Sequence, residues 1–209
     1  MRHFKQLAGI LALAAASASC GDVVREGKSP VFVVIDSLQG IRGAAVLGQP
    51  SGTLTSDVIT LVTSPAPCST TAPCPTIFND QGRVTLRLTL RDIGTSANPT
   101  TPSPNNEVTI YRYRVRYIRA DGRNTPGVDV PYTFDGAATA TVPTTGTAQV
   151  GFELVRHVAK QEAPLVQLAT SATIISTIAE ITFYGRDRVG NEVSVTGTIT
   201  VDFGNFGDF

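Results

Sequence analysis

The residue types that most enzymes use are scarce in this chain. There are two histidines, His3 and His157, and no Gly-x-Ser-x-Gly motif that would present a nucleophilic serine. A serine hydrolase needs a base beside its nucleophile, and only His157, near the end of an expected strand, could serve. A surface or hydrogen-bonded structural role is the commoner one for such a histidine. The letters Asp202-Phe203-Gly204 match the kinase magnesium motif, but the other kinase motifs are missing. The sequence therefore predicts no catalytic residue and no cofactor.

Carboxylates offer two further kinds of chemistry. Paired acids can hydrolyse glycosidic bonds without histidine, but the sequence does not place any two at the required separation. The glutamates in question are Glu153, Glu162, Glu180 and Glu192. Oxygen ligands for calcium occur at 121–124 and 187–192, yet neither segment follows the twelve-residue calcium loop. We therefore expect solvated or arginine-paired carboxylates, and no metal site.

Arginines recur at spaced positions in two segments that we expect to be strands. They are Arg83, Arg87 and Arg91 in the first segment, and Arg112, Arg114 and Arg116 in the second. If these strands are neighbours, six like charges share one face, which is unfavourable without compensation. We expect acids such as Glu153 or Glu180 to neutralise them. The alternative is an anionic ligand (a surface polysaccharide, a lipid phosphate or an acidic partner protein), because arginine binds carboxylate and phosphate in bidentate fashion.

The N-terminal segment has the features of an export signal. Arg2 and Lys5 precede an uncharged apolar run over 7–16, and small residues at 17–19 lead to Cys20. The run is too short to span a bilayer comfortably. The placement of Cys20 resembles the bacterial lipoprotein signal, which implies that Cys20 becomes the lipidated first residue of the mature chain. Ser17 stands where that signal usually has leucine, so an ordinary signal peptidase and a secreted form are the alternative.

The two other cysteines, Cys68 and Cys74, are close together in a segment rich in proline. Proline lacks a backbone donor, so the segment 64–76 cannot be a central strand. In an exported protein these cysteines can form a disulfide that closes a small exposed loop. A structural zinc site is the rival interpretation, but it would lack ligands, since no histidine or second cysteine pair is nearby.

Composition and charge narrow the class of protein. Residues 20–209 carry 15 basic and 17 acidic side chains, so nothing global favours nucleic acid binding. The charge is uneven, because 83–123 holds eight arginines against three acids and 124–209 holds nine acids against four basic residues. The chain lacks tryptophan and long helix-forming runs, while threonine, valine, glycine and proline are plentiful. This composition is typical of all-β proteins.

Short alternating segments separated by glycine and proline predict about nine strands. Residues 82–92 alternate cleanly, and 107–120 are expected to turn Tyr111, Tyr113, Val115 and Tyr117 toward the core. Asp135-Gly136 suggests a tight hairpin turn between strands 128–134 and 138–142. Other expected strands are 30–36, 58–63, 146–158, 178–187 and 192–203, with a long loop or irregular hairpin over 37–56 and a strand or extended loop over 163–176.

The closing segment carries a second resemblance. Phe183-Tyr184-Gly185-Arg186-Asp187 is followed by Arg188-Val189, Gly190-Asn191 and the alternating run Glu192-Val193-Ser194-Val195. An aromatic strand, Asp, two residues, Gly-Asn and an alternating strand resemble the last hairpin of bacterial immunoglobulin-like and fibronectin-type modules. The resemblance covers about thirty residues and implies that Asp187 and Asn191 shape the turn without carrying chemistry.

Together these features predict an all-β, antiparallel immunoglobulin-like β-sandwich with long loops rich in Pro, Gly, Ser and Thr. The expected organisation is a lipoprotein-type signal at 1–19, a tether at 20–29 and a sandwich at 30–209. The alternative is a boundary near 106 that divides the sandwich region into two parts. The expected function is that of a non-catalytic binding or structural module. It would be anchored through its lipid on the periplasmic or outer surface of the cell envelope, with an envelope protein or anionic glycan as its partner. The alternatives are a carbohydrate hydrolase with paired carboxylates and a subunit of a larger envelope assembly.

Overall fold

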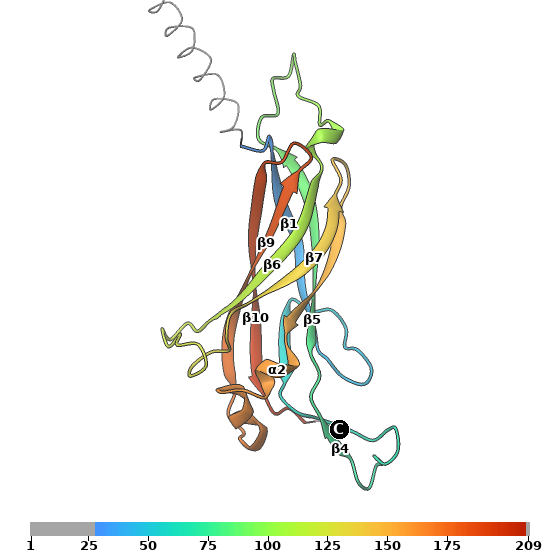
Figure 1. Cartoon of the computed structure of the whole chain (residues 1–209), viewed down its shortest axis with the longest axis vertical. Helices are drawn as coiled ribbons and strands as arrows, with labels where there is room; N and C mark the ends of the chain where they lie inside the picture. The colour runs from blue at the N-terminus through green and yellow to red at the C-terminus, as the bar shows by residue number, and fades with distance from the viewer. Residues whose placement is uncertain (1–27, 208–209) are drawn as a thin grey trace, which may run out of the picture.

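The computed structural model describes residues 28–207 and shows two β-sheets packed around one core (Figure 1). The three-stranded sheet has the order β1-β5-β8, and the five-stranded sheet has the order β2-β10-β9-β6-β7. A separate ribbon pairs β3 with β4. The strands are β1 (Val31–Ile41), β2 (Thr53–Asp57), β3 (Thr60–Val62), β4 (Cys74–Thr76), β5 (Asp80–Leu90), β6 (Val108–Ile118), β7 (Phe134–Val142), β8 (Ala148–Val155), β9 (Ile175–Asp187) and β10 (Glu192–Gly204). This architecture confirms the all-β sandwich.

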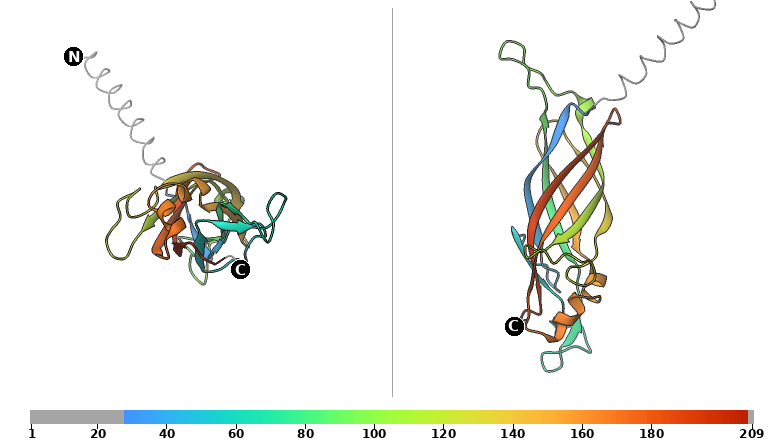
Figure 2. Two further views of the ribbon diagram at one scale, coloured as in Figure 1. Left: turned by 90° about the horizontal axis from the view of Figure 1, so that it is seen from below. Right: turned by 90° about the vertical axis from the view of Figure 1, so that its left-hand side faces the viewer.

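Neighbouring strands are antiparallel in both main sheets, with one exception. The short strand β2 runs parallel to the end of β10, from Thr53 opposite Thr200 to Asp57 opposite Gly204. Seen along the long axis, the sheets curve around a single core (Figure 2). Among residues 28–207, helical structure is limited to η1 (Pro104–Asn106), α2 (His157–Lys160) and η2 (Leu165–Thr170).

Aromatic rings fill the middle of the core. Phe183 of β9 lies 5.2 Å from the ring centroid of Phe152 on β8, so these two rings join the two sheets. Tyr113 of β6 contacts both, with centroids 5.3 Å from Phe152 and 6.4 Å from Phe183. The hydroxyl groups of two tyrosines on β6 also cross the core. Tyr113 Oη accepts a hydrogen bond from the Glu153 N–H at 3.1 Å, and Tyr117 Oη donates one to the Leu154 carbonyl at 2.6 Å.

A β-bulge in β6 overturns part of the expected burial pattern. The register shifts between Ile110 and Arg112 against both β7 and β9. Ile110 and Tyr113 are therefore both buried, while Tyr111 is 38% exposed instead of facing the core. One additional residue in a strand reverses the inward and outward positions beyond it.

The expected hairpin turn at Asp135-Gly136 is also wrong. Both residues lie inside β7, which continues from Phe134 to Val142. Gly136 occupies an inward position beneath the Tyr113 ring, where a Cβ atom would lie 2.2 Å from Tyr113 Cζ. The glycine is thus required for close packing, and it marks no chain reversal.

Two other segments differ from expectation. Residues 37–41 extend β1 instead of forming a loop, and β2 occupies 53–57. The segment 163–176 forms the short helix η2 before β9 begins at Ile175, so it is not a single strand. Leu165 and Leu168 of η2 are buried, which explains the apolar composition that suggested a strand.

Candidate functional site

The two arginine rows lie in different sheets. Arg83 and Arg87 belong to β5, which pairs with β1 and β8, and Arg91 directly follows its last residue, whereas Arg112, Arg114 and Arg116 belong to β6, which pairs with β7 and β9. The strands are not neighbours, so the six guanidinium groups do not form one continuous face. Alternation correctly predicts that these arginines point outward but carries no information about which strands pair.

Each arginine of the β6 row has an acidic partner. Asp135 of β7 accepts hydrogen bonds from Arg112 at 3.1 Å and from Arg114 at 3.0 Å, and Glu180 of β9 lies 3.6 Å from Arg116. The hydrogen bonds from Arg114 hold the pKa of Asp135 below its usual value. Arg112 also lies 4.1 Å from the centroid of the Tyr184 ring. The acids come from the acidic C-terminal part of the chain, as the charge distribution predicts.

The β5 row has more varied partners. Arg87 forms an ion pair with Asp36 of β1 at 2.6 Å. Arg91 lies 3.8 Å from the centroid of the Phe32 ring and donates a hydrogen bond to the Ser29 carbonyl at 2.7 Å. Arg83 is exposed and stands between Gln39 and Gly151 in the ladder, neither of which is acidic. Only Arg87 in this row has an acidic partner among the ion pairs of the described residues.

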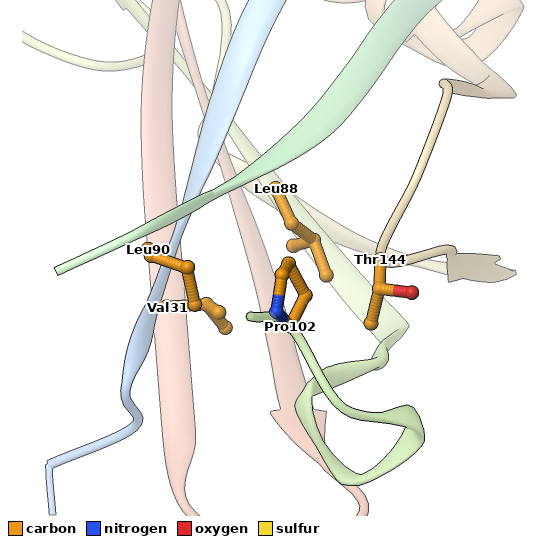
Figure 3. Close-up of a pocket in the computed structure, with 5 residues that line it drawn as sticks. All are labelled: Val31, Leu88, Leu90, Pro102 and Thr144. Carbon is orange, nitrogen blue, oxygen red and sulfur yellow. The ribbon is translucent and has the colours of Figure 1, made fainter. Parts of the chain in front are cut away.

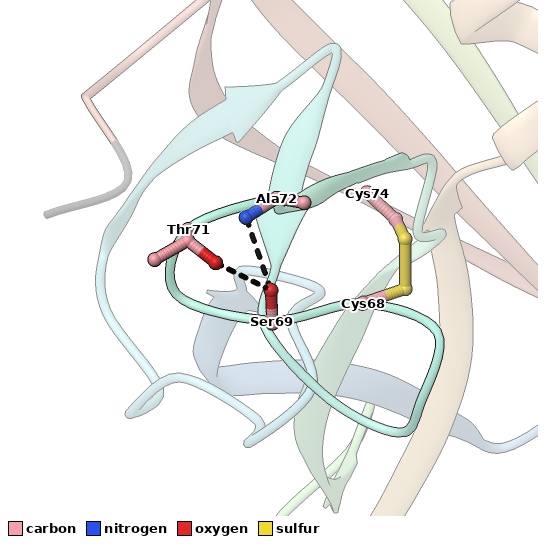
Figure 4. The surroundings of a disulfide bond; sticks show 5 residues. All are labelled: Cys68, Ser69, Thr71, Ala72 and Cys74. Atoms are coloured by element: carbon pink, nitrogen blue, oxygen red, sulfur yellow. Dashed lines mark hydrogen bonds between the residues drawn. A yellow bond between two sulfur atoms is a disulfide. The ribbon is translucent and has the colours of Figure 1, made fainter.

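Cys68 and Cys74 form the expected disulfide, with Cα atoms 5.3 Å apart (Figure 4). Within the closed loop, Ser69 Oγ accepts a hydrogen bond from the Ala72 N–H at 3.0 Å. The loop lies in the connection between β3 and β4 at one end of the long axis, and the described chain begins at the opposite end (Figure 1).

In the two turns considered for calcium, the aspartate carboxylates accept hydrogen bonds from other groups of the same chain. The Asp121 carboxylate accepts hydrogen bonds from Arg119 and Arg123, which hold its pKa at about 2. The Asp187 carboxylate accepts hydrogen bonds from the Asn191 side chain at 2.8 Å and from the Val189 N–H at 3.0 Å. Asp187 and Asn191 therefore shape the last hairpin turn, as the resemblance implies. Within residues 28–207, no group of three or more potential metal ligands gathers at one place.

The candidate catalytic groups remain scattered. His157 is exposed at the start of α2. In the β9–β10 ladder, Glu180 is level with Thr198 and Glu192 is level with Arg186. These carboxylates are therefore about 20 Å apart along the strands at the usual rise per residue, well beyond the spacing that glycoside hydrolysis uses. Glu153 instead accepts a hydrogen bond from the side chain of Asn79 at 3.2 Å.

A buried charged cluster, which sequence reasoning missed, lies where β2 ends and β5 begins. Lys160 Nζ is 2.9 Å from Asp80 Oδ2, and the two side chains are 1% and 0% exposed. Asp80 Oδ2 also accepts a hydrogen bond from Ser56 Oγ at 2.6 Å, and its Oδ1 accepts one from the Gly43 N–H at 2.7 Å. Desolvation is the largest influence on both charged groups, raising the pKa of Asp80 and lowering the pKa of Lys160 despite their mutual attraction.

A second ion pair borders this buried cluster. Arg42 Nη2 lies 2.5 Å from Asp57 Oδ2, and the Asp57 side chain is fully buried. The Phe206 N–H donates a hydrogen bond to Asp57 Oδ1 at 3.3 Å, which ties the C-terminal segment to the same region. No local sequence signal identifies this group, because its members come from five separate segments of the chain.

At the other end of the sandwich, a small pocket opens between β1, β5 and two loops (Figure 3). Its lining residues are Val31, Leu88, Leu90, Pro102 and Thr144, and its volume is about 10 Å³. A space of this size holds about one water molecule. The pocket is too small for a sugar ring or any other organic ligand.

The chain matches no protein-family model and no curated protein sequence at a significant level. No helix among residues 28–207 is long and apolar enough to cross a membrane. The lipidation candidate Cys20 and the signal at 1–19 lie outside the described residues.

Proposed function

We propose that this chain is a non-catalytic, lipid-anchored protein of the cell envelope whose β-sandwich acts as a binding or structural module. The observation that carries this proposal is that two segments lie at opposite ends of the sandwich. The described chain begins at one end of the long axis, and the disulfide-closed loop lies at the other (Figure 1). A domain tethered through Cys20 would present that loop on the side away from its anchor.

The junction between tether and sandwich suits an anchored domain. Ser29 is 1% exposed, its carbonyl accepts a hydrogen bond from Arg91, and its hydroxyl interacts with Asp187. Immediately before β1, the chain is thus fixed to the residue that follows β5 and to the last residue of β9. From Cys20 to Ser29 the tether reaches at most about 30 Å when fully extended, which would keep the sandwich close to the membrane surface.

The exterior supports a module over a hydrolase. The arginines of the β6 row are paired with acids on a sheet surface, and Glu180 and Glu192 are too far apart to act on one glycosidic bond. A sheet face whose charged side chains are paired is suited to protein or polymer contacts.

The mass and location of the mature protein test the anchor. The full chain is expressed in a bacterium, the membrane fraction is isolated, and the intact mass is measured. We expect a chain that begins at Cys20 and carries added acyl mass, and we expect Cys20→Ser to abolish the acyl mass. Ser19→Ala keeps a small residue before the cleavage position and serves as the matched control that remains lipidated. A wild-type chain that begins at Ser19 without acyl mass would refute the lipid anchor.

A further inference from the structure

The contact between Lys160 and Asp80 brings an amine and a carboxyl group together in the dry interior. Lys160 ends the one-turn helix α2, which follows β8, and Asp80 begins the neighbouring strand β5. Asp80 is opposite Val155, the last residue of β8, in the β5–β8 ladder. The pairing of these strands therefore fixes the backbone on both sides of the contact, at Asp80 and just before α2. With the lysine side chain 1% exposed and the aspartate 0%, solvent does not separate Nζ from the carboxyl group at 2.9 Å.

The geometry is unfavourable for a simple ion pair. Nζ lies within ion-pair distance of Oδ2, but the angle of approach does not meet hydrogen-bond geometry, and Nζ has no other hydrogen-bond partner among the described residues. A charged lysine has three donors, and each donor that lacks a hydrogen-bond partner in the interior carries a desolvation penalty. Removing both charges from water adds a further penalty, which only well-aligned buried pairs recover. An amide nitrogen would carry one hydrogen and no charge, so it would avoid most of these costs.

The carboxyl group is held in a defined orientation. The Gly43 N–H donates to Oδ1, and the Ser56 hydroxyl lies against Oδ2 on the side of Lys160. Burial favours the neutral acid of Asp80 and the neutral amine of Lys160, since it raises the pKa of the first and lowers the pKa of the second. A neutral amine is nucleophilic and a neutral carboxylic acid is electrophilic, so both partners are shifted toward their reactive forms.

We propose that Lys160 Nζ and Asp80 Cγ form an intramolecular isopeptide bond in the folded protein. The lone pair of Nζ adds to Cγ, and the negative charge that develops on Oδ1 is stabilised by the Gly43 N–H. One proton moves from Nζ to Oδ2, directly or through the Ser56 hydroxyl. Oδ2 already carries the acid proton, so it leaves as water while the carbonyl at Oδ1 re-forms. A Cγ–N bond replaces the Cγ–Oδ2 bond, and no oxidant or other reactant is required.

Two of the surrounding groups act on the carboxyl group of Asp80, and a third forms a separate ion pair. Ser56 and Gly43 position the carboxyl group, while Asp57 is held by Arg42 and carries its own ion pair. The cross-link would join the end of the β8–α2 segment to the start of β5 and close a covalent ring from residue 80 to residue 160. This ring contains β5, β6, β7 and β8, which belong to both sheets. It would restrain their separation in the unfolded state in the same manner as a disulfide.

Intact mass spectrometry of the purified, denatured and disulfide-reduced wild-type protein tests the proposal. We expect a mass about 18 Da below the sequence mass, corresponding to one lost water. Trypsin should then yield one joined species of peptides 43–83 and 157–186, because a modified Lys160 resists cleavage. Cleavage after Lys28, an exposed lysine, serves as the internal control for digestion. The Lys160→Arg variant keeps the positive charge but cannot form this bond, so its mass should equal its sequence mass.

Two results would overturn the proposal. The first is a wild-type mass at the sequence value together with release of the free peptide 157–160. The second is a water loss without the joined peptide, as an aspartyl succinimide would give. Both readouts come from the wild-type chain, so they stand even if Lys160→Arg fails to fold. Neither depends on the membrane anchor, because the bond would form in a chain with or without lipid at Cys20.

Discussion

The hydroxyl group of Tyr117 provides a quantitative test of how the two sheets are joined. Tyr117 is 2% exposed on β6, and its hydroxyl donates a 2.6 Å hydrogen bond to the Leu154 carbonyl on β8. Leu154 falls where the β5–β8 register is irregular, between the residues paired with Asp80 and Gln81. Burial raises the pKa of Tyr117 far above its usual value, which favours the protonated hydroxyl that donates this hydrogen bond.

Replacing Tyr117 with phenylalanine removes this donor while keeping the ring. The ring contact with Phe203, at 5.6 Å between centroids, should persist, so the change isolates the hydrogen bond. A buried carbonyl left without its partner costs about 1–3 kcal/mol. For a domain of this size, the midpoint of thermal unfolding falls by about 2–4 °C per kcal/mol. We therefore expect Tyr117→Phe to lower the free energy of unfolding by about 2 kcal/mol and the melting temperature by about 4–8 °C.

Urea unfolding followed by circular dichroism measures the effect. The midpoint should move to lower urea while the slope stays constant, because the surface exposed on unfolding does not change. Tyr132→Phe is the matched control, since Tyr132 is 52% exposed and its hydroxyl can be replaced by solvent. If Tyr117→Phe and Tyr132→Phe differ by less than about 0.5 kcal/mol, the inter-sheet hydrogen bond does not contribute as argued.

Three other perturbations address packing and acid stability. Gly136→Ala places a Cβ 2.2 Å from the opposing tyrosine ring and should destabilise the fold by about 1–3 kcal/mol in urea titrations, whereas Gly151→Ala has open space and should be nearly neutral. Phe183→Ala empties a fully buried position and should cost about 3–5 kcal/mol in the same titrations. Burial raises the pKa of Asp187, but hydrogen bonds from Asn191, Ser29 and Val189 outweigh it and lower the pKa below 3.8. Its stabilisation is complete above that value and is lost as the pH falls through the folded-state pKa, so Asp187→Asn should flatten the acid side of a stability–pH curve measured by thermal melts.

Alternation alone was sufficient to predict β5 but insufficient for β6. In β5, Val84 and Leu86 are buried and the arginines point outward, as the sequence predicts. In β6, the bulge at Tyr111 changes the phase within a segment that looks equally regular. The bulge fits the glycine of β7, whose lack of a side chain leaves room for the Tyr113 ring. That relation joins residues more than twenty positions apart, so neither strand reveals it separately.

For the arginine rows, the sequence predicts that acidic partners exist but not which arginine pairs with which acid. The excess of acids after residue 123 correctly predicts that the basic strands find partners there, because Asp135 and Glu180 both pair with β6. The order of strands decides which arginines benefit, and β5 receives Asp36 from β1 instead. The net charge of a segment predicts that its arginines need acidic partners from elsewhere in the chain, whereas the strand order determines which residues form each ion pair.

The buried Lys160–Asp80 contact is a third feature that could not be predicted from the sequence. A lysine in a short polar segment is expected at the surface, because removing its charge from water is unfavourable. Its burial follows only after α2 has been folded against the start of β5, next to Gly43 and Ser56 from two other segments. A site assembled from four distant segments has no sequence motif, yet it places an amine and a carboxyl group in fixed contact without water. The covalent state of Lys160 is therefore the property by which the chemistry of this buried contact should first be judged.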